Sequence, residues 1–176
     1  MAGLPFKLTV TDKDVLRALG DLAHKDGGLV RASLKNIGIA MVKSVRKRFD
    51  AEQAPDGTPW KQLSPAYKAG KKGQKILQES GMRGGLLGTI VWQLQGSDKV
   101  AIGTNKKYAA VHQFGATILP RRGDFLVFKL GGRLVFARKV VIPARPFLGI
   151  SVADRQTILD TIEDVAAANW SGTAHP

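Results

Sequence analysis

Apolar residues recur every three or four positions in three stretches of the chain, and this spacing predicts three amphipathic helices. The first follows Thr11 or Asp12, either of which can cap a helix, and ends at Gly27-Gly28. The second runs from Leu29 to Ala51, and the last runs from Ser151 to about Ala168. The buried stripe of the second helix is expected to consist of Val30, Leu34, Ile37, Met41, Val45 and Phe49.

Alternation of apolar and polar residues, with glycine turns between the runs, predicts strands elsewhere in the chain. Gly131-Gly132 predicts a tight β-hairpin, because glycine takes positive φ at both turn positions without steric cost. Strands joined by such short turns run antiparallel. We therefore predict an α+β fold, in which the N-terminal helices and a C-terminal helix pack on a mainly antiparallel sheet with a long β-hairpin. The expected strands are Phe6–Val10, Thr89–Leu94, Lys99–Gly103, Phe125–Leu130 and Arg133–Val141.

The length of 176 residues and the hydrophobic content of 44% suit one domain with a substantial core. We expect this domain to cover residues 1–170 and a frayed tail to cover residues 171–176. The basic, glycine-bounded segment from Pro65 to Gly73 is expected to be exposed and mobile. No apolar run approaches membrane-spanning length, so we expect no contact with a membrane.

Residues suited to catalysis or metal binding are scattered. The chain has no cysteine, and its three histidines, His24, His112 and His175, lack the spacing of metal ligands. The glycines and lysines of residues 70–73 lack the spacing and the preceding strand of a phosphate-binding loop. We therefore expect no enzyme activity, no cofactor and no metal.

The net charge of +13 favours a polyanionic partner, nucleic acid above all, or an acidic protein surface. A basic surface that faces only solvent is the alternative interpretation. The last helix, by contrast, is acidic between Asp154 and Asp164, so a basic body and an acidic helix also suit packing between subunits. The candidate DNA contacts are Lys43, Arg46, Lys47, Lys71 and Lys72.

Two motifs flank the predicted hairpin: Tyr108-Ala109-x-x-His112-Gln113-Phe114-Gly115 before it and Ile142-Pro143-Ala144-Arg145-Pro146-Phe147-Leu148-Gly149 after it. We expect Trp60, Phe114 and Phe147 to be buried, either in the core or between subunits. The candidate interface residues are Trp60, Tyr108, His112, Gln113, Phe114, Arg121, Arg122, Arg133, Arg138, Pro143, Arg145, Pro146 and Phe147.

The predicted hairpin mixes apolar and cationic residues on both faces of its returning strand. Alternation places Leu134, Phe136 and Arg138 on one face, and Val135 and Lys139 on the other. Our hypothesis is that the hairpin is an assembly element, with the acidic side of the last helix as one candidate partner. In the alternative, the hairpin is solvated, and the aliphatic parts of its long cationic side chains lie on its own sheet.

Taken in order, these motifs resemble the phage virion morphogenesis (tail completion) family of Mu-like and related tailed phages. The resemblance covers most of the chain, from about Val15 to the last helix. Besides the two motifs, it rests on Phe49, Asp56-Gly57-x-x-Trp60-x-x-Leu63, Ile76-Leu77 with Ser80-Gly81, and Val100-Ala101-Ile102-Gly103.

The resemblance implies a structural virion protein at the head–tail neck or the tail end, acting in tail completion, as a tail terminator or as a head–tail connector. It further implies a homo-oligomeric ring around the DNA channel, for which we expect six-fold symmetry. The implied partners are other neck proteins, the tail tube and the genomic DNA, first in the host cytoplasm and then in the virion. The alternative is a sequence-independent nucleic-acid-binding protein that acts alone.

Overall fold

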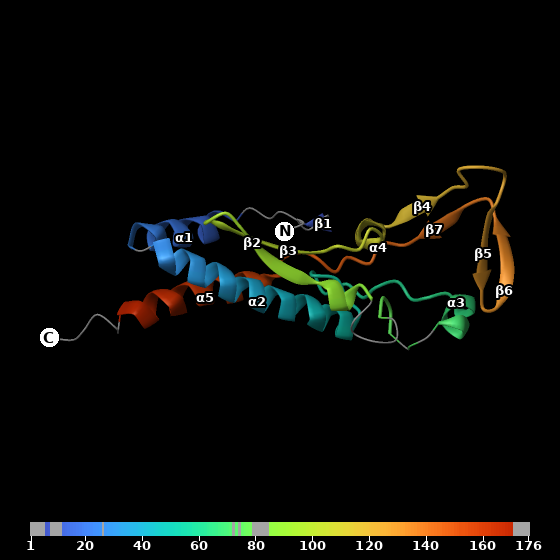
Figure 1. The fold of residues 1–176 in the computed structure, drawn as a ribbon. Helices are drawn as coiled ribbons and strands as arrows, with labels where there is room; N and C mark the ends of the chain where they lie inside the picture. The colour runs from blue at the N-terminus through green and yellow to red at the C-terminus, as the bar shows by residue number, and fades with distance from the viewer. Residues whose placement is uncertain are drawn as a thin grey trace.

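The computed structural model describes residues 6–7, 12–25, 27–71, 73, 75–78 and 85–170. The chain forms an elongated molecule with two parts (Figure 1). One end is a body of helices and a small sheet, and the other end is an arm built from two short two-stranded sheets. The fold is α+β, as predicted.

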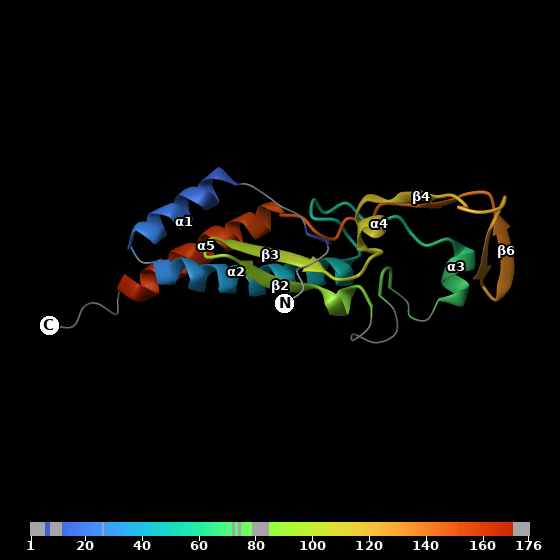
Figure 2. The same ribbon diagram turned by 45° about the horizontal axis from the view of Figure 1, so that its top comes forward.

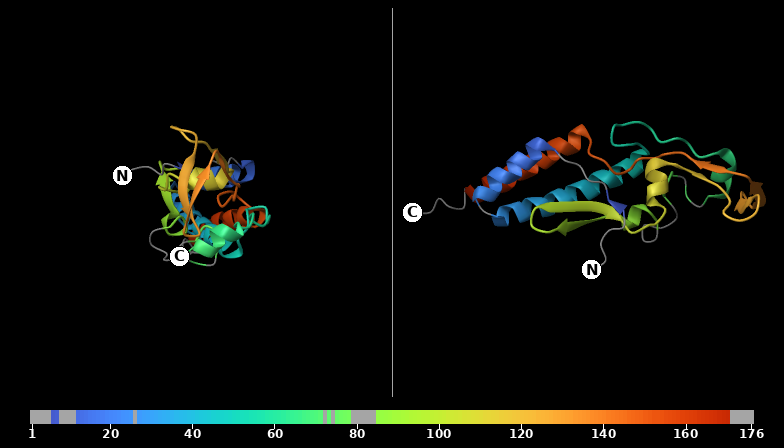
Figure 3. Two further views of the ribbon diagram at one scale, coloured as in Figure 1. Left: turned by 90° about the vertical axis from the view of Figure 1, so that its right-hand side faces the viewer. Right: turned by 90° about the horizontal axis from the view of Figure 1, so that it is seen from above.

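Helix α2 (Gly27–Ala51) is the centre of the body. Helices α1 (Lys13–Lys25) and α5 (Val152–Trp170) pack on one side of it, and the sheet covers the other side (Figures 2 and 3). The predicted apolar stripe of α2 is confirmed, because all six of its residues are buried. Asp12 is the cap of α1, since its Oδ1 accepts hydrogen bonds from the backbone N–H groups of Asp14 (3.0 Å) and Val15 (3.2 Å).

The body sheet has the strand order β1–β3–β2 and is antiparallel throughout. Its strands are β1 (Phe6–Lys7), β2 (Val91–Gln95) and β3 (Lys99–Thr104), and a 3-10 turn, η1 (Leu87–Thr89), precedes β2. The ring of Trp92 lies directly on α2 at Gly38, where a Cβ atom would meet the ring at 2.7 Å. The missing side chain of Gly38 therefore lets the sheet approach the helix.

The arm leaves the body after the short helix α4 (Ala109–Phe114). Strands β4 (Ala116–Ile118) and β7 (Val140–Ile142) pair to form its shaft, and β5 (Leu126–Leu130) and β6 (Arg133–Ala137) pair to form a hairpin at its end (Figure 1). Gly131 and Gly132 have φ angles of 57° and 82°, which confirms the predicted glycine turn.

One prediction about the strands is wrong. They form three separate sheets instead of one. The predicted run from Arg133 to Val141 breaks at Arg138-Lys139, and the residues beyond the break pair with β4. The basic segment from Pro65 to Gly73 contains helix α3 (Pro65–Gly70), which Ser64 caps by accepting a hydrogen bond from the N–H of Tyr67 at 3.3 Å. Its residues are exposed, as expected. The predicted strand residues 8–10, the candidate cap Thr11, the motif residues Ser80 and Gly81, and the tail 171–176 lie outside the described residues.

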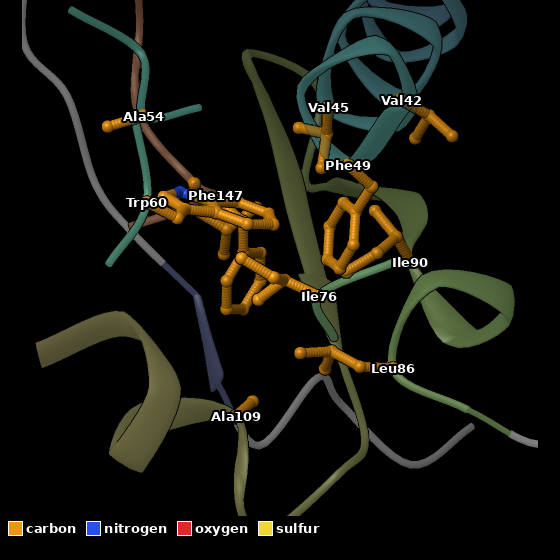
Figure 4. Packing of buried hydrophobic residues seen from close by; sticks show 11 residues of the cluster. Val42, Val45, Phe49, Ala54, Trp60, Ile76, Leu86, Ile90, Ala109 and Phe147 are labelled. Atoms are coloured by element: carbon orange, nitrogen blue, oxygen red, sulfur yellow. The ribbon is translucent and has the colours of Figure 1, made fainter. Parts of the chain in front are cut away.

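A cluster of buried apolar side chains fills the junction between the body and the arm (Figure 4). The ring of Phe49, at the end of α2, lies edge-on to Trp60 with 5.3 Å between centroids and is tilted against Phe147 at 5.5 Å. A second cluster lies between α1, α2 and α5 and includes Leu34 and Ile158. The apolar end of α2 is thus the anchor for loops that come from distant parts of the sequence.

Next to Phe49, Arg48 makes a buried ion pair with Asp154 of α5. Its cationic neighbours on α2, Lys43, Arg46 and Lys47, are exposed, whereas Arg48 is buried. The guanidinium also donates hydrogen bonds to the carbonyl oxygens of Phe147 (3.0 Å) and Gly149 (2.9 Å). Asp154 in turn accepts hydrogen bonds from the hydroxyls of Ser44 and Ser151 and from the N–H of Ser151.

The same contacts form the N-terminal cap of α5. Ser151 Oγ accepts a hydrogen bond from the N–H of Asp154 at 3.0 Å, and the carboxylate of Asp154 accepts one from the N–H of Ser151 at 2.8 Å. This reciprocal pattern is the capping box that the spacing of these two residues indicates. Asp154 therefore satisfies the helix end and the buried arginine at once.

Removing the carboxylate in an Asp154→Ala variant should lower the free energy of unfolding by about 3–5 kcal/mol, because Arg48 would remain buried without its counter-charge. Urea denaturation followed by circular dichroism measures the change. Lys35→Ala, an exposed change on α2, is the control and should shift stability by no more than about 0.5 kcal/mol. A decrease of similar size in both variants would contradict the assigned role of Asp154.

Lowering the pH should also remove the stabilisation that the carboxylate of Asp154 provides. Burial alone raises the pKa of Asp154, but hydrogen bonds from Ser44 and Ser151 and the charge of Arg48 outweigh it, so the pKa lies below its ordinary value of 3.8. The stabilisation is therefore complete above pH 3.8 and is lost as the pH falls through the lower, folded-state pKa. Between about pH 5 and pH 2, stability should fall more steeply in the natural protein than in Asp154→Asn. Parallel slopes in urea titrations would contradict this expectation.

Candidate functional site: a buried clamp and an exposed arm

The two motifs that flank the hairpin lie side by side where the arm leaves the body. The N–H of Arg145 donates a hydrogen bond of 2.7 Å to the carbonyl of His112. Gly115 has a φ of 75°, and a Cβ atom on it would lie 2.8 Å from the backbone nitrogen of Ala144. Only glycine fits this close approach without displacing the backbone.

Gln113 holds the second motif in place. Its Oε1 accepts hydrogen bonds from the N–H groups of Phe147 and Leu148, both at 3.0 Å. Its Nε2 donates one to the carbonyl of Leu148 at 2.8 Å. The side chain is buried, so these three bonds satisfy main-chain groups that water does not reach.

The loop before α3 joins the same assembly through Trp60 and Arg145. Trp60 Nε1 donates a hydrogen bond to the carbonyl of Pro146 at 2.8 Å, and Arg145 Nε donates one to the carbonyl of Lys61 at 2.9 Å. Burial lowers the pKa of Arg145 below its ordinary value, and the carbonyl oxygens stabilise its charge. We call the five residues that link these three segments the clamp: Trp60, Gln113, Arg145, Pro146 and Phe147.

A cavity of about 570 Å³ lies beside the clamp, between α3 and the strands of the arm. Three further candidate residues, Tyr108, His112 and Pro143, line it, together with Phe128 and Leu130 of the hairpin. The ring of Tyr108 lies edge-on to that of His112, with 5.7 Å between centroids. The lining is mainly apolar, and it suits the packing of a further side chain better than it suits catalysis.

The remaining candidate interface residues are exposed. Phe114 is 64% exposed, so its expected place in the core of this chain is wrong, and a place between subunits stays a prediction. Arg121, Arg122 and Arg133 lie on the exposed arm, as does Arg138, whose guanidinium carbon sits 5.7 Å from the centroid of the Phe125 ring. The clamp and these arginines are therefore separate features.

The candidate DNA contacts do not form one group. Lys43, Arg46 and Lys47 are exposed on one stretch of α2. Lys71 follows α3, is half-buried and donates a hydrogen bond from Nζ to the carbonyl of Gln78. Lys72 lies outside the described residues.

Sequence reasoning misses two sets of residues. Arg48 looks like a solvated cation, although its spacing, three residues after Val45 and seven after Met41, places it on the apolar stripe of α2. The second set consists of large apolar side chains that the arm exposes, and the period-2 alternation of the strands is its signal. These are Ile118, Leu119, Phe125, Val127, Leu134, Phe136 and Val141.

Within the described part of the chain, no three histidine, aspartate or glutamate side chains gather closely enough to hold a metal ion. None of the helices described here is both long and apolar enough to cross a membrane.

Alanine variants of the clamp and of the exposed Phe114 should differ in their free energy of unfolding. Phe147→Ala and Trp60→Ala should each lower the free energy of unfolding by about 3–5 kcal/mol, because each leaves a cavity in a closed cluster. Phe114→Ala should cost less than about 1 kcal/mol in the isolated subunit, because its ring is mostly in water. Chemical denaturation of the three variants measures the difference, and equal decreases would contradict the assignment.

Comparisons with known proteins identify relatives in a phage and in a Mu-like prophage. Mu-like prophage FluMu G protein 1 of Haemophilus influenzae is 36% identical over 107 residues, which are 58% of this chain and 64% of that protein, so the chain spans just under two thirds of this relative. FluMu G protein 2 of the same organism is 28% identical over 131 residues, or 74% of each chain. Putative capsid assembly protein G of Escherichia phage Mu is 27% identical over 143 residues, or 78% of this chain and 80% of that protein.

No solved structure matches the chain. The model of the phage virion morphogenesis family matches residues 10–166, a range that contains α1, α2, most of α5, the clamp and the whole arm. The chain therefore belongs to the phage virion morphogenesis family and has a structural role in phage assembly.

Proposed function

We propose that this protein is a non-enzymatic subunit of the head–tail neck or the tail end of a tailed phage, where its copies form a ring around the DNA channel. The observation that carries the proposal is the arm. It projects from a well-packed body and exposes large apolar side chains along both its shaft and its hairpin. Monomeric proteins rarely expose contiguous apolar patches of this kind, whereas surfaces that bind other proteins do.

Similarity to assembly proteins of phages supports this location. One relative carries the name putative capsid assembly protein, and two others are G proteins of a Mu-like prophage. A ring at the joint between head and tail is a place where such a protein would meet other neck proteins, the tail tube and the genome. The six-fold symmetry expected above is part of this proposal.

The net charge of +13 supports a place next to DNA. Lys43, Arg46 and Lys47 are exposed on α2 and would attract phosphate groups without reading base sequence. The same exposed cations favour the second candidate function, a nucleic-acid-binding protein that acts alone. The apolar arm has no part in that second function, and we therefore prefer the ring.

Electron microscopy of intact particles, combined with the mass of the purified protein in solution, tests the proposal. We expect ring density at the head–tail joint that accommodates this fold, and a purified protein that forms oligomers of defined size. A protein that stays monomeric and binds DNA only at low salt, with no density in the particle, would favour the second candidate.

A charge variant separates the two functions. Replacing Lys43, Arg46 and Lys47 with glutamine should weaken binding to DNA, and the salt dependence of the remaining affinity should decrease by about one unit of slope for each phosphate that the protein no longer neutralises. The same variant should leave the oligomer intact, as sedimentation would report. A matched triple change at the exposed Arg31, Lys35 and Lys99, which also removes three positive charges, is the control for net charge alone.

A further inference from the structure

One face of the terminal hairpin is apolar and exposed. We call it the outer face and define it by Phe125, Val127, Lys129, Leu134, Phe136 and Arg138. The strand register pairs Val127 with Phe136 and Lys129 with Leu134, so these side chains lie together. The four apolar members are 44–62% exposed.

The opposite, inner face of the hairpin already has neighbours. Leu126, Phe128 and Leu130 are half-buried, and the last two line the cavity above α3. The turn of the hairpin touches α3 at Gly70, where a Cβ atom would lie 3.1 Å from the Cα of Gly131. The outer face therefore points away from the rest of the chain, and a two-stranded hairpin of this kind is only marginally stable by itself.

The outer face also carries positive charge, because Lys129 and Arg138 belong to it. Two further cations are exposed nearby: Arg133, which pairs with Leu130 of the inner face, and Lys139, which follows the end of β6. In the described residues no carboxylate lies within 4.0 Å of any of these four side chains. A partner that covers the apolar side chains would therefore need acidic groups around an apolar or small-residue centre.

The chain itself carries such a surface on the exposed side of α5. Asp160, Glu163 and Asp164 are exposed there, and Val152, which is 89% exposed, lies on the same side. Arg155 does not neutralise these acids, because its guanidinium pairs with Asp12 and Asp14 of α1.

The polar groups next to these acids favour close packing. The hydroxyl of Thr157 donates to the carbonyl of Ala153 at 2.9 Å, and that of Thr161 donates to the carbonyl of Thr157 at 2.6 Å. Both threonines thus present their methyl groups outward with their hydroxyls already satisfied. Covering this surface leaves few hydrogen-bonding groups without partners.

We propose that the outer face of the hairpin in one copy docks on the acidic side of α5 in a second copy. Lys129 and Arg138 would then face Asp160, Glu163 and Asp164, with the apolar side chains packed over Val152 and Thr157. The hairpin and α5 lie in opposite parts of the elongated subunit (Figure 1), so the contact is head-to-tail. Head-to-tail contacts close into rings or extend into filaments, and this inference rests on the ring of the proposed function.

Charge reversal with rescue tests the contact. One variant carries Lys129→Glu and Arg138→Glu, and the other carries Asp160→Lys and Glu163→Lys. Each alone should raise the dissociation constant of the oligomer at least about tenfold, because like charges would face each other. An equal mixture of the two should assemble again, because each reversed surface meets a complementary one on the other variant. The control, Lys99→Glu with Lys107→Glu, has the same change in net charge as the first variant at exposed positions outside both surfaces and should assemble normally.

Sedimentation velocity reports the assembly state, and circular dichroism confirms that each variant is folded. Oligomers that persist in both reversed variants, or a mixture that fails to recover, would overturn the docking while leaving the ring intact. A natural protein that stays monomeric at every concentration would instead overturn the ring, and this inference with it.

Crosslinking gives a second measurement that does not depend on charge reversal. The chain has no cysteine, so Leu134→Cys in one preparation and Gln156→Cys in another are the only thiols in a mixture. A short bismaleimide should join the two chains. When Lys107→Cys takes the place of Leu134→Cys in the mixture, no crosslinked pair of chains should form. Absence of the Leu134–Gln156 product in assembled oligomers would overturn the proposed contact.

Discussion

The buried pair of Arg48 and Asp154 is the interaction on which the arrangement of this chain depends. Two charges removed from water are tolerated only when each finds a close partner and its other hydrogen-bonding atoms are satisfied. Here one guanidinium satisfies the carboxylate at the start of α5 and two main-chain carbonyls of the segment that returns from the arm. The end of α2 therefore fixes both the position of α5 and the course of the chain at residues 147–149.

The clamp extends this anchoring to the arm. Gln113 and Trp60 direct their polar atoms to the main chain of residues 146–148, so the buried main-chain groups of a segment without regular secondary structure still have hydrogen-bond partners. Beyond the clamp the conditions change. The shaft and the hairpin have two strands each and no closed core of their own, and their largest side chains stay in water. The body thus has a closed apolar core, whereas the arm leaves large apolar side chains exposed.

Much of the local structure was predictable from the sequence. The stripe of α2, the glycine turn, the antiparallel pairing of β2 with β3 and the capping box of α5 are local features, in which nearby residues determine the outcome. The division into three sheets was not predictable in this way. Whether Val140 pairs with the strand before it or with β4 depends on a break at Arg138-Lys139, and either pairing satisfies the same local alternation.

The burial of individual motif residues was also only partly predictable from the sequence. Trp60 and Phe147 are buried, as expected, whereas Phe114, from the same kind of motif, points outward. An aromatic residue at the end of a six-residue helix can face either way, and distant loops decide which. The spacing of Arg48 places it on the apolar stripe of α2, but the local pattern does not identify its partner, Asp154, which lies 106 positions away.

The clamp sits at the root of a long, narrow arm, and a lever of this shape magnifies rotation at its root. A few degrees of change between Gln113 and the segment at Phe147 would move the hairpin tip much farther than it would move any atom of the body. In an assembly joined through the tip, curvature would therefore respond to residues that are packed inside the subunit. Substitutions in this hydrogen-bonded root would change how many copies close a circle, even with every contact surface unaltered.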